Sequence, residues 1–187
     1  GDHYVTYPIL LAMSEKFGKG ISIIHFDAHC DTWPDDEEYS LNHGTMFYKA
    51  IKNGIVDPAK SAQIGIRTWN DDFMGTNIFD AQYVHDNGWQ QVVAQIKEIV
   101  GDNPVYLTFD IDSLDPAFAP GTGTPVPGGL SSAQALAIVR NLDGLNLIGA
   151  DVVEVSPSYD HAEITALAAA HVACDVICLL AQQKSRD

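Results

Sequence analysis

Two short, largely apolar segments, residues 21–26 and 105–109, constrain the fold of this chain more than any other feature. Both are rich in β-branched and aromatic residues, which is typical of a strand that helices cover on both sides. Segments with helical periodicity lie between and after them, so strands and helices alternate along the chain. The alternation predicts an α/β fold of three layers, α-β-α, with a parallel sheet in the middle. Such sheets bind ligands at the carboxyl ends of their strands.

Capping residues and periodicity predict the other elements. Gly18, Gly54 and Gly101 each end a predicted helix, and Ser131 begins one. The Pro- and Gly-rich segment 113–129 is a predicted loop, and a loop this long inside a compact domain is usually functional. The expected helices cover residues 8–17, 45–53, 90–100, 131–140 and 164–180, and the further expected strands cover residues 62–66, 81–84 and 147–155.

The charge balance restricts the partners of the protein. Ten Lys and Arg residues stand against 25 Asp and Glu residues, so the formal net charge is −15. This charge repels nucleic-acid phosphates and anionic lipids, and it favours cationic ligands such as metal ions, amines and guanidinium groups. We therefore expect neither a nucleic-acid partner nor a membrane partner.

Size and cysteine content indicate one intracellular domain. At 187 residues, 46% of them apolar, the chain is long enough for a single domain over residues 1–187. Its most apolar stretch, residues 162–182, carries charged residues, and we interpret it as a buried amphipathic helix with His171 in the core. Three cysteines without framework spacing indicate a reducing compartment, which predicts a cytoplasmic protein. Cys174 and Cys178 lie four residues apart and are expected to pack rather than bind metal.

Residue types that bind metals follow both apolar segments directly. Asp27, His29 and Asp31 come after the first segment, and Asp110 and Asp112 come after the second. Residues two apart in an extended chain project to one side, so each group faces the place where a parallel sheet binds ligands. Burying four carboxylates together is unfavourable unless cations neutralise them. Oxygen and imidazole donors without a thiolate favour divalent manganese over structural zinc.

Each of these two motifs alone has an ordinary explanation. Short Asp-x-Asp matches are common, and carboxylates at strand ends often make structural hydrogen bonds. The two motifs together, at the ends of two strands of one sheet, favour a metal site. Cys30 lies between two of the candidate ligands, but the alternation points it away, so we expect it to pack in the interior.

Longer motifs around these residues resemble those of the ureohydrolases, the family of arginase, agmatinase and guanidinobutyrase. Further stretches, residues 43–47, 63–67 and 151–155, are similar to bacterial agmatinases in particular. The resemblance covers nearly the whole chain and implies an arginase/deacetylase-like fold. The family motifs are Gly-Asp-His at residues 1–3, His-Phe-Asp-Ala-His-Cys-Asp at 25–31, Phe-Asp-Ile-Asp-Ser-Leu-Asp-Pro at 109–116, and the stretches 119–125 and 128–130.

The resemblance implies a binuclear centre with two Mn²⁺ ions per subunit. The implied ligands are His3, Asp27, His29, Asp31, Asp110 and Asp112. Asp27 and Asp110 would bridge the ions, His3 and Asp31 would complete one site, and His29 and Asp112 would complete the other. Such a pair lowers the pKa of a shared water and delivers a bridging hydroxide to the central carbon of a guanidinium group. Asp31 is therefore also counted among the catalytic residues.

The resemblance also implies roles in substrate binding and proton transfer. Glu154, near the end of the predicted strand 147–155, would accept a paired hydrogen bond from two guanidinium nitrogens. Thr124 would supply a hydroxyl that supports this carboxylate. His43 would carry protons between bulk water and the leaving amine, which suits a side chain that titrates near neutral pH. Without the resemblance, His43 is an ordinary loop histidine and Glu154 an ordinary residue at a strand end.

The implied reaction is hydrolysis of a linear guanidino compound, and agmatine, which yields putrescine and urea for polyamine biosynthesis, is the expected substrate. Consecutive acids in the loop over residues 32–42 would repel the α-carboxylate of arginine and attract a distal amine, although an acidic run is also ordinary in a solvated loop. The alternative substrate is guanidinobutyrate or another guanidino acid. Its carboxylate would need a cation at the mouth of the site, and Arg67 is a candidate.

The resemblance finally implies that the chain lacks the N-terminal part of the family fold, with its edge strands and part of the substrate mouth. It also implies a homo-oligomer, a trimer or a hexamer. His3 would then lie on a terminus that frays. An alternative of another class is therefore a catalytically incomplete fragment that binds metal. No role is implied for His25, and His85 and His161 are expected at the surface.

Overall fold

The structure, a computed structural model, describes residues 1–35 and 42–186. Of the four consecutive acids predicted to discriminate between substrates, residues 35–38, all but Asp35 therefore lie outside the described part of the chain. The strands are β1 (Ser22–Phe26), β2 (Ala62–Ile64), β3 (Asn77–Phe79), β4 (Val105–Asp110) and β5 (Leu147–Val153). The helices are α1 (Thr6–Phe17), α2 (Met46–Lys52), α3 (Ala81–Val100), α4 (Ser132–Arg140) and α5 (Ile164–Lys184), and short 3-10 helices cover His3–Val5, Pro58–Lys60, Ile111–Ser113 and Pro157–Tyr159.

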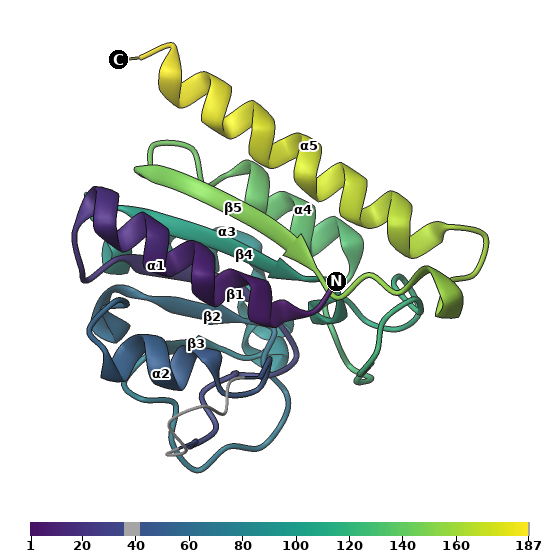
Figure 1. The fold of residues 1–187 in the computed structure, drawn as a ribbon. Helices are drawn as coiled ribbons and strands as arrows, with labels where there is room; N and C mark the ends of the chain where they lie inside the picture. Colours follow the sequence, from purple (N-terminus) through teal and green to yellow (C-terminus); the bar gives the residue numbers. More distant parts are fainter. Residues whose placement is uncertain (36–41, 187) are drawn as a thin grey trace.

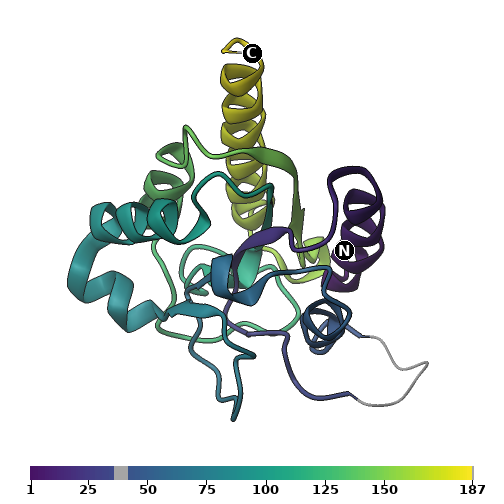
Figure 2. The ribbon, with the colours of Figure 1, turned by 90° about the vertical axis from the view of Figure 1, so that its left-hand side faces the viewer.

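The five strands form one parallel sheet in the order β3-β2-β1-β4-β5 (Figure 1). Helices cover both of its faces, which confirms the predicted three-layer α/β fold. α1 and α2 pack on one face around Ile23 and Tyr106, and α3, α4 and α5 pack on the other face around Ile24 and Leu107. Figure 2 shows α1 and α2 on one side of the molecule and α3 and α4 on the other. Neighbouring residues of a strand face opposite sides, so β1 is buried along its whole length.

The order of the strands reverses between β1 and β4. From β1 the chain passes to β2 and β3 on one side, and it then returns to β4 on the other side of β1. β1 and β4 pair from Ser22 opposite Val105 to Phe26 opposite Phe109, so their carboxyl ends are level. Ligands of open α/β sheets bind outside the carboxyl ends of strands at such a reversal. The metal-binding motifs follow these two strands.

The strand expected over residues 81–84 is wrong, because these residues begin α3. The side chain of Asp80 accepts a hydrogen bond from a backbone N–H of the first turn and caps the helix there, and β3 lies just before it. α3 comprises two helical segments that meet at Gly88, whose φ of 77° interrupts the helix. The predicted cap at Ser131 is confirmed, because its hydroxyl accepts a hydrogen bond from the backbone N–H of Gln134.

Helix α5 is less buried than predicted. It packs against α4 and β5, but Leu167 and Ile177 are 59% and 66% exposed. His171, Cys174 and Cys178 are exposed too, so the predictions that they lie in the core are wrong. The reason is that α5 is apolar nearly all round, so its sequence defines no single buried face. By length and composition α5 could cross a membrane, but one such helix is only a weak indication.

Candidate metal centre

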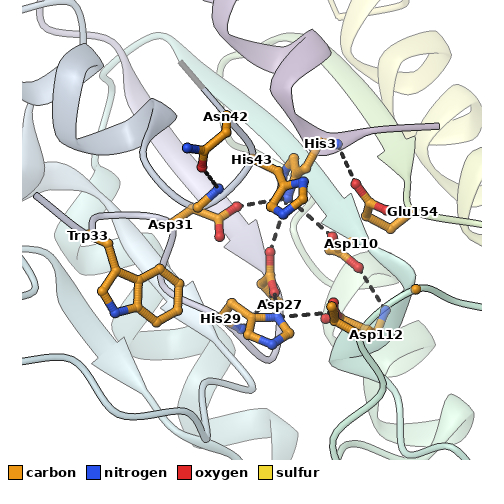
Figure 3. Close-up of a pocket in the computed structure, with 13 residues that line it drawn as sticks. His3, Asp27, His29, Asp31, Trp33, Asn42, His43, Asp110, Asp112 and Glu154 are labelled. Atoms are coloured by element: carbon orange, nitrogen blue, oxygen red, sulfur yellow. Dashed lines mark hydrogen bonds and ion pairs between the residues drawn. The ribbon is translucent and has the colours of Figure 1, made fainter. Parts of the chain in front are cut away.

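The six predicted metal ligands line one pocket of about 350 Å³ at the carboxyl ends of β1 and β4 (Figure 3). They come from three separate segments of the chain, which only the fold brings together. The imidazole of His29 is 20% exposed, and the other five side chains are at most 5% exposed. The predicted ligands are His3 before α1, Asp27, His29 and Asp31 after β1, Asp110 at the end of β4, and Asp112 in the 3-10 helix that follows β4.

The first group of candidate ligands surrounds Nδ1 of His3. This atom lies 3.1 Å from Oδ2 of Asp27, 3.1 Å from Oδ2 of Asp31 and 3.2 Å from Oδ2 of Asp110. Within the described part of the chain, neither Nδ1 of His3 nor Oδ2 of Asp31 has a hydrogen-bond partner, although both atoms are buried. An unsatisfied buried polar atom costs about 1–3 kcal/mol, so such atoms are rare without a function. A cation between these four side chains would satisfy both atoms.

The second group lies next to the first and shares Asp27 with it. Nδ1 of His29 lies 3.2 Å from Oδ1 of Asp27 and 3.1 Å from Oδ2 of Asp112, and one ligand atom of each residue lies within 4.8 Å of the others. Oδ2 of Asp27 lies towards His3, and Oδ1 lies towards His29, where it also accepts a hydrogen bond of 2.7 Å from the backbone N–H of His29. Oδ1 of Asp110 likewise accepts a hydrogen bond from the backbone N–H of Asp112. The bridging roles of Asp27 and Asp110 stay predictions.

His25 is a site residue that the sequence reasoning missed. Its Nε2 lies 2.7 Å from Oδ2 of Asp27, and its buried ring packs against Phe47 with the ring centroids 4.7 Å apart. The signal was available, because His25 precedes Asp27 by two residues and strand alternation places both on one side. His85 and His161 are exposed, as predicted.

Burial and mutual repulsion shift the pKa values of the carboxyl groups. Burial raises the pKa of Asp110 well above its usual range, and the charges of Asp27 and Asp112 raise it further. Burial and the charge of Asp27 also raise the pKa of Asp31. Burial acts in the same direction on Asp27, but the charge of His25 and hydrogen bonds with histidines hold the pKa of Asp27 well below its usual range. Burial and repulsion therefore disfavour the ionised forms of Asp31 and Asp110, whereas the histidines favour the ionised form of Asp27.

The neighbouring carboxylates raise the pKa values of two histidines of the site. Burial lowers the pKa of His29, but hydrogen bonds with Asp112 and Asp27 and their charges raise it to about 10. Burial also opposes protonation of His3, and contacts with Asp110, Asp27 and Asp31 outweigh it and raise the pKa of His3 well above 6.5.

The donor set fits divalent cations that accept oxygen and nitrogen ligands. Four carboxylates and two imidazoles converge, and the nearby Cys30 is buried as predicted. The sulfur of Cys30 accepts a hydrogen bond of 2.9 Å from the side chain of Asn70 rather than facing the pocket. Unsatisfied buried atoms, opposed carboxylates and this chemistry together fit a pair of bound cations.

Glu154 and His43 lie at the rim of the same pocket. Oε1 of Glu154 accepts a hydrogen bond from the backbone N–H of His3. The backbone φ of Glu154 is 62°, in the left-handed region, and the φ of Asp31 is 55°. Such conformations cost non-glycine residues of order 1–3 kcal/mol and cluster at functional sites. The side chain of His43 is 58% exposed, and one of its nitrogens lies within 4.8 Å of a carboxylate oxygen of Glu154.

Two residues considered for roles at the substrate make other contacts in the structure. The hydroxyl of Thr124 donates to Oδ2 of Asp112 at 3.2 Å, so it supports a candidate metal ligand instead of Glu154. Arg67 does not offer its charge to a ligand, because its guanidinium donates to five backbone carbonyls, among them those of Asp112 at 2.6 Å and Val126 at 2.7 Å. Irregular backbone needs donors from outside itself, and Arg67 supplies them to the loop over residues 113–129.

Comparison with known proteins defines the class to which this fold and site belong. The arginase family matches residues 1–179, and the chain belongs to this family. The resemblance of the motifs to ureohydrolases and the expected arginase-like fold are therefore confirmed.

Individual relatives are agmatinases and an amidinohydrolase. The agmatinase of Chromobacterium violaceum is 67% identical over 184 residues, which are 98% of this chain and 57% of the relative. The crystal structure of a hypothetical agmatinase from Burkholderia thailandensis superposes with a TM-score of 0.98 at 68% identity, covering 99% of this chain and 59% of that one. The structure of proclavaminate amidinohydrolase from Streptomyces clavuligerus superposes with a TM-score of 0.91 at 40% identity, covering 96% of this chain and 62% of that one. The chain spans about three fifths of the length of these relatives.

Proposed function

We propose that the protein containing this chain hydrolyses a linear guanidino compound and releases urea, with two Mn²⁺ ions as cofactors and agmatine as the substrate that yields putrescine. One observation carries the proposal: the buried Nδ1 of His3, which has no hydrogen-bond partner among the described residues, faces three buried carboxylates beside Glu154. Relatives named agmatinase, at 56–67% identity, support the choice of substrate.

The residues of the chain divide the work between them. His3, Asp27, His29, Asp31, Asp110 and Asp112 would hold the metal ions. Bound manganese supplies Lewis acidity, which lowers the pKa of water towards neutrality so that it can act as a nucleophile. Glu154 would accept hydrogen bonds from two guanidinium nitrogens and thereby orient the carbon that is attacked. His43 would hold a proton for the amine that leaves when the C–N bond breaks, and its exposure allows exchange of that proton with bulk water.

The pocket favours a substrate whose far end is not a carboxylate. Among the described residues that line it there is neither Lys nor Arg. Arg67, the cation considered for a guanidino acid, already donates to the loop over residues 113–129. Agmatine ends in an ammonium group, which suits a pocket lined by acids and by the indole of Trp33. We further propose that residues 1–187 belong to one catalytic domain of a cytoplasmic homo-oligomer, a trimer or a hexamer.

A substrate panel tests the proposal. The whole protein is loaded with manganese, and urea release is measured from agmatine, guanidinobutyrate and arginine at equal concentrations. We expect the highest kcat/KM with agmatine. A higher kcat/KM with guanidinobutyrate would favour the guanidino-acid alternative, and tight metal binding without urea from any substrate would favour the catalytically incomplete one.

A further inference from the structure

A carboxylate outside the predicted ligand set lies behind His3. Asp151 of β5 accepts hydrogen bonds from three hydroxyl groups. Thr108 donates to its Oδ1 at 2.6 Å, and Thr6 and Tyr106 donate to its Oδ2 at 2.7 and 2.9 Å. The three hydroxyl-bearing side chains are buried, so Asp151 is a fixed acceptor. No role in the proposed reaction has been assigned to it.

Thr108 connects this carboxylate to the candidate metal centre. Its Oγ1 lies 2.8 Å from Nε2 of His3, and both side chains are at most 1% exposed. Three groups therefore form a continuous hydrogen-bonded chain from β5 through β4 to the pocket: the carboxylate of Asp151, the hydroxyl of Thr108 and the imidazole of His3.

The chemistry of the three groups fixes the direction of both hydrogen bonds. An ionised carboxylate can only accept, so the hydroxyl of Thr108 gives its single proton to Asp151. The oxygen of Thr108 then offers only lone pairs to His3, and Nε2 of His3 must carry the hydrogen that it donates. A neutral imidazole with its hydrogen on Nε2 has a bare lone pair on Nδ1. Nδ1 is the nitrogen that faces Asp27, Asp31 and Asp110.

Apart from the three carboxylates that face Nδ1, the other contacts of His3 hold the ring but leave the position of its hydrogen open. The rings of His25 and Phe47 pack edgewise against it, with centroids 5.1 and 5.8 Å away. Glu154 accepts a hydrogen bond from the backbone of His3, which leaves the imidazole untouched. The hydrogen bond with Thr108 is the contact that distinguishes the two ring nitrogens.

We propose that Thr108 and Asp151 are positioning residues that hold His3 in its Nε2–H tautomer and aim its Nδ1 lone pair at a bound metal ion. We call the hydrogen-bonded chain of Asp151, Thr108 and His3 the relay. The inference rests on the proposed function, because the relay can orient a metal ligand only if His3 binds a metal ion. Groups that hydrogen-bond to a ligating histidine orient its ring and fix its tautomer, and their loss typically weakens metal binding or activity by about 10- to 100-fold.

The sequence offers a matched control for a purely structural role. Thr108→Val removes the hydroxyl that joins Asp151 to His3 and keeps the shape of the side chain. Thr6→Val removes another buried hydroxyl that donates to the same carboxylate at 2.7 Å; this hydroxyl lies 3.5 Å from that of Thr108 and does not touch His3. Thr108→Ser keeps the relay. Asp151→Asn provides a second way to disturb the relay, because its amide can donate to Thr108 and reverse the direction of the hydrogen bonds.

The test measures binding of Mn²⁺ to the whole protein by equilibrium dialysis with metal analysis, together with the EPR signal of a coupled manganese pair. We expect Thr108→Val to lower the affinity for one of the two Mn²⁺ ions by about 10- to 100-fold. At limiting manganese this variant should lose the EPR signal of the coupled pair. We expect Asp151→Asn to lower the affinity for the same Mn²⁺ ion. Thr108→Ser should keep the wild-type affinity for this ion, and Thr6→Val should bind both ions as the wild type does.

Three results would overturn these expectations in distinguishable ways. Wild-type affinity for both ions in Thr108→Val and in Asp151→Asn would overturn the inference alone. Equal weakening by Thr6→Val would show that the hydroxyl groups serve only the stability of the fold. A wild-type protein that binds fewer than two ions would overturn the proposed function, and the inference with it, before any variant is compared.

Discussion

The substitution Glu154→Gln separates a substrate-binding role from a structural one. Oε1 of Glu154 accepts a hydrogen bond from the backbone N–H of His3, and a glutamine keeps an oxygen at that position. The left-handed backbone at this residue, with a φ of 62°, strains glutamine no more than glutamate. The substitution therefore removes the negative charge and one acceptor while it retains the shape and the contact with His3.

The expected magnitude follows from the hydrogen bonds that are lost. A hydrogen bond to a charged group contributes roughly 1.5–3 kcal/mol. Since about 1.4 kcal/mol corresponds to a tenfold change, kcat/KM for agmatine should fall by about 10- to 150-fold. A guanidinium that is no longer oriented loses further rate, so this range is a lower bound. The melting temperature and the manganese content should stay at their wild-type values.

The assay measures urea release per manganese-loaded molecule together with thermal unfolding. Glu163→Gln is a matched control, because Glu163 also has a left-handed backbone, with a φ of 58°, but is exposed and does not line the pocket. We expect the control to keep its kcat/KM. A lower melting temperature with unchanged turnover in Glu154→Gln would assign Glu154 to the fold and remove the strongest structural reason for a guanidinium substrate.

Three further predictions concern a metal ligand, a loop and a helix cap. Asp110→Asn should abolish urea release but leave the metal-free protein at least as stable by thermal unfolding in chelator, because burial and the charges of Asp27 and Asp112 raise the pKa of Asp110. Retained activity would contradict the two-metal centre. Arg67→Met should lower the free energy of unfolding, measured in urea, by about 2–4 kcal/mol, because buried carbonyls lose their donor. The preference for agmatine over guanidinobutyrate should stay the same. A changed preference at unchanged stability would show that Arg67 contacts the substrate. Asp160 accepts backbone N–H bonds from His161 and, in the first turn of α5, from Thr165 and Ala166. A side-chain hydrogen bond with Thr165 and these backbone hydrogen bonds lower the pKa of Asp160 to about 2, although burial acts in the opposite direction. Because the pKa of Asp160 is lower in the folded state, its charge stabilises the fold above about pH 4, and this stabilisation is lost as the pH falls towards 2. The difference in the free energy of unfolding between wild type and Asp160→Asn should therefore shrink below about pH 4. A difference that does not depend on pH in denaturation experiments would exclude this role.

Local sequence patterns predicted strands β1 and β4 and the candidate metal ligands that follow them, whereas His3 entered the ligand set only through the family resemblance. The apolar segments before Asp27 and Asp110 are strands β1 and β4, because a strand covered on both faces must be apolar on both. The spacing of two between ligands needed no knowledge of the fold, because side chains of an extended chain alternate between two sides whatever lies around them. The same rule, applied one step earlier, would also have found His25.

The tertiary structure alone decided which distant groups meet. The order of the strands puts the ends of β1 and β4 side by side, and the sequence does not contain that order in any local pattern. Arg67 was considered as a cation for a guanidino acid and Thr124 as a support for Glu154, but a hydrogen bond depends on which acceptors come within reach. Asp151 is 148 residues from His3 along the chain, and only the pairing of β4 with β5 places Thr108 between them. Burial, charge and hydrogen bonding of a side chain are set by its neighbours in space, and those neighbours come from segments whose meeting depends on the whole fold.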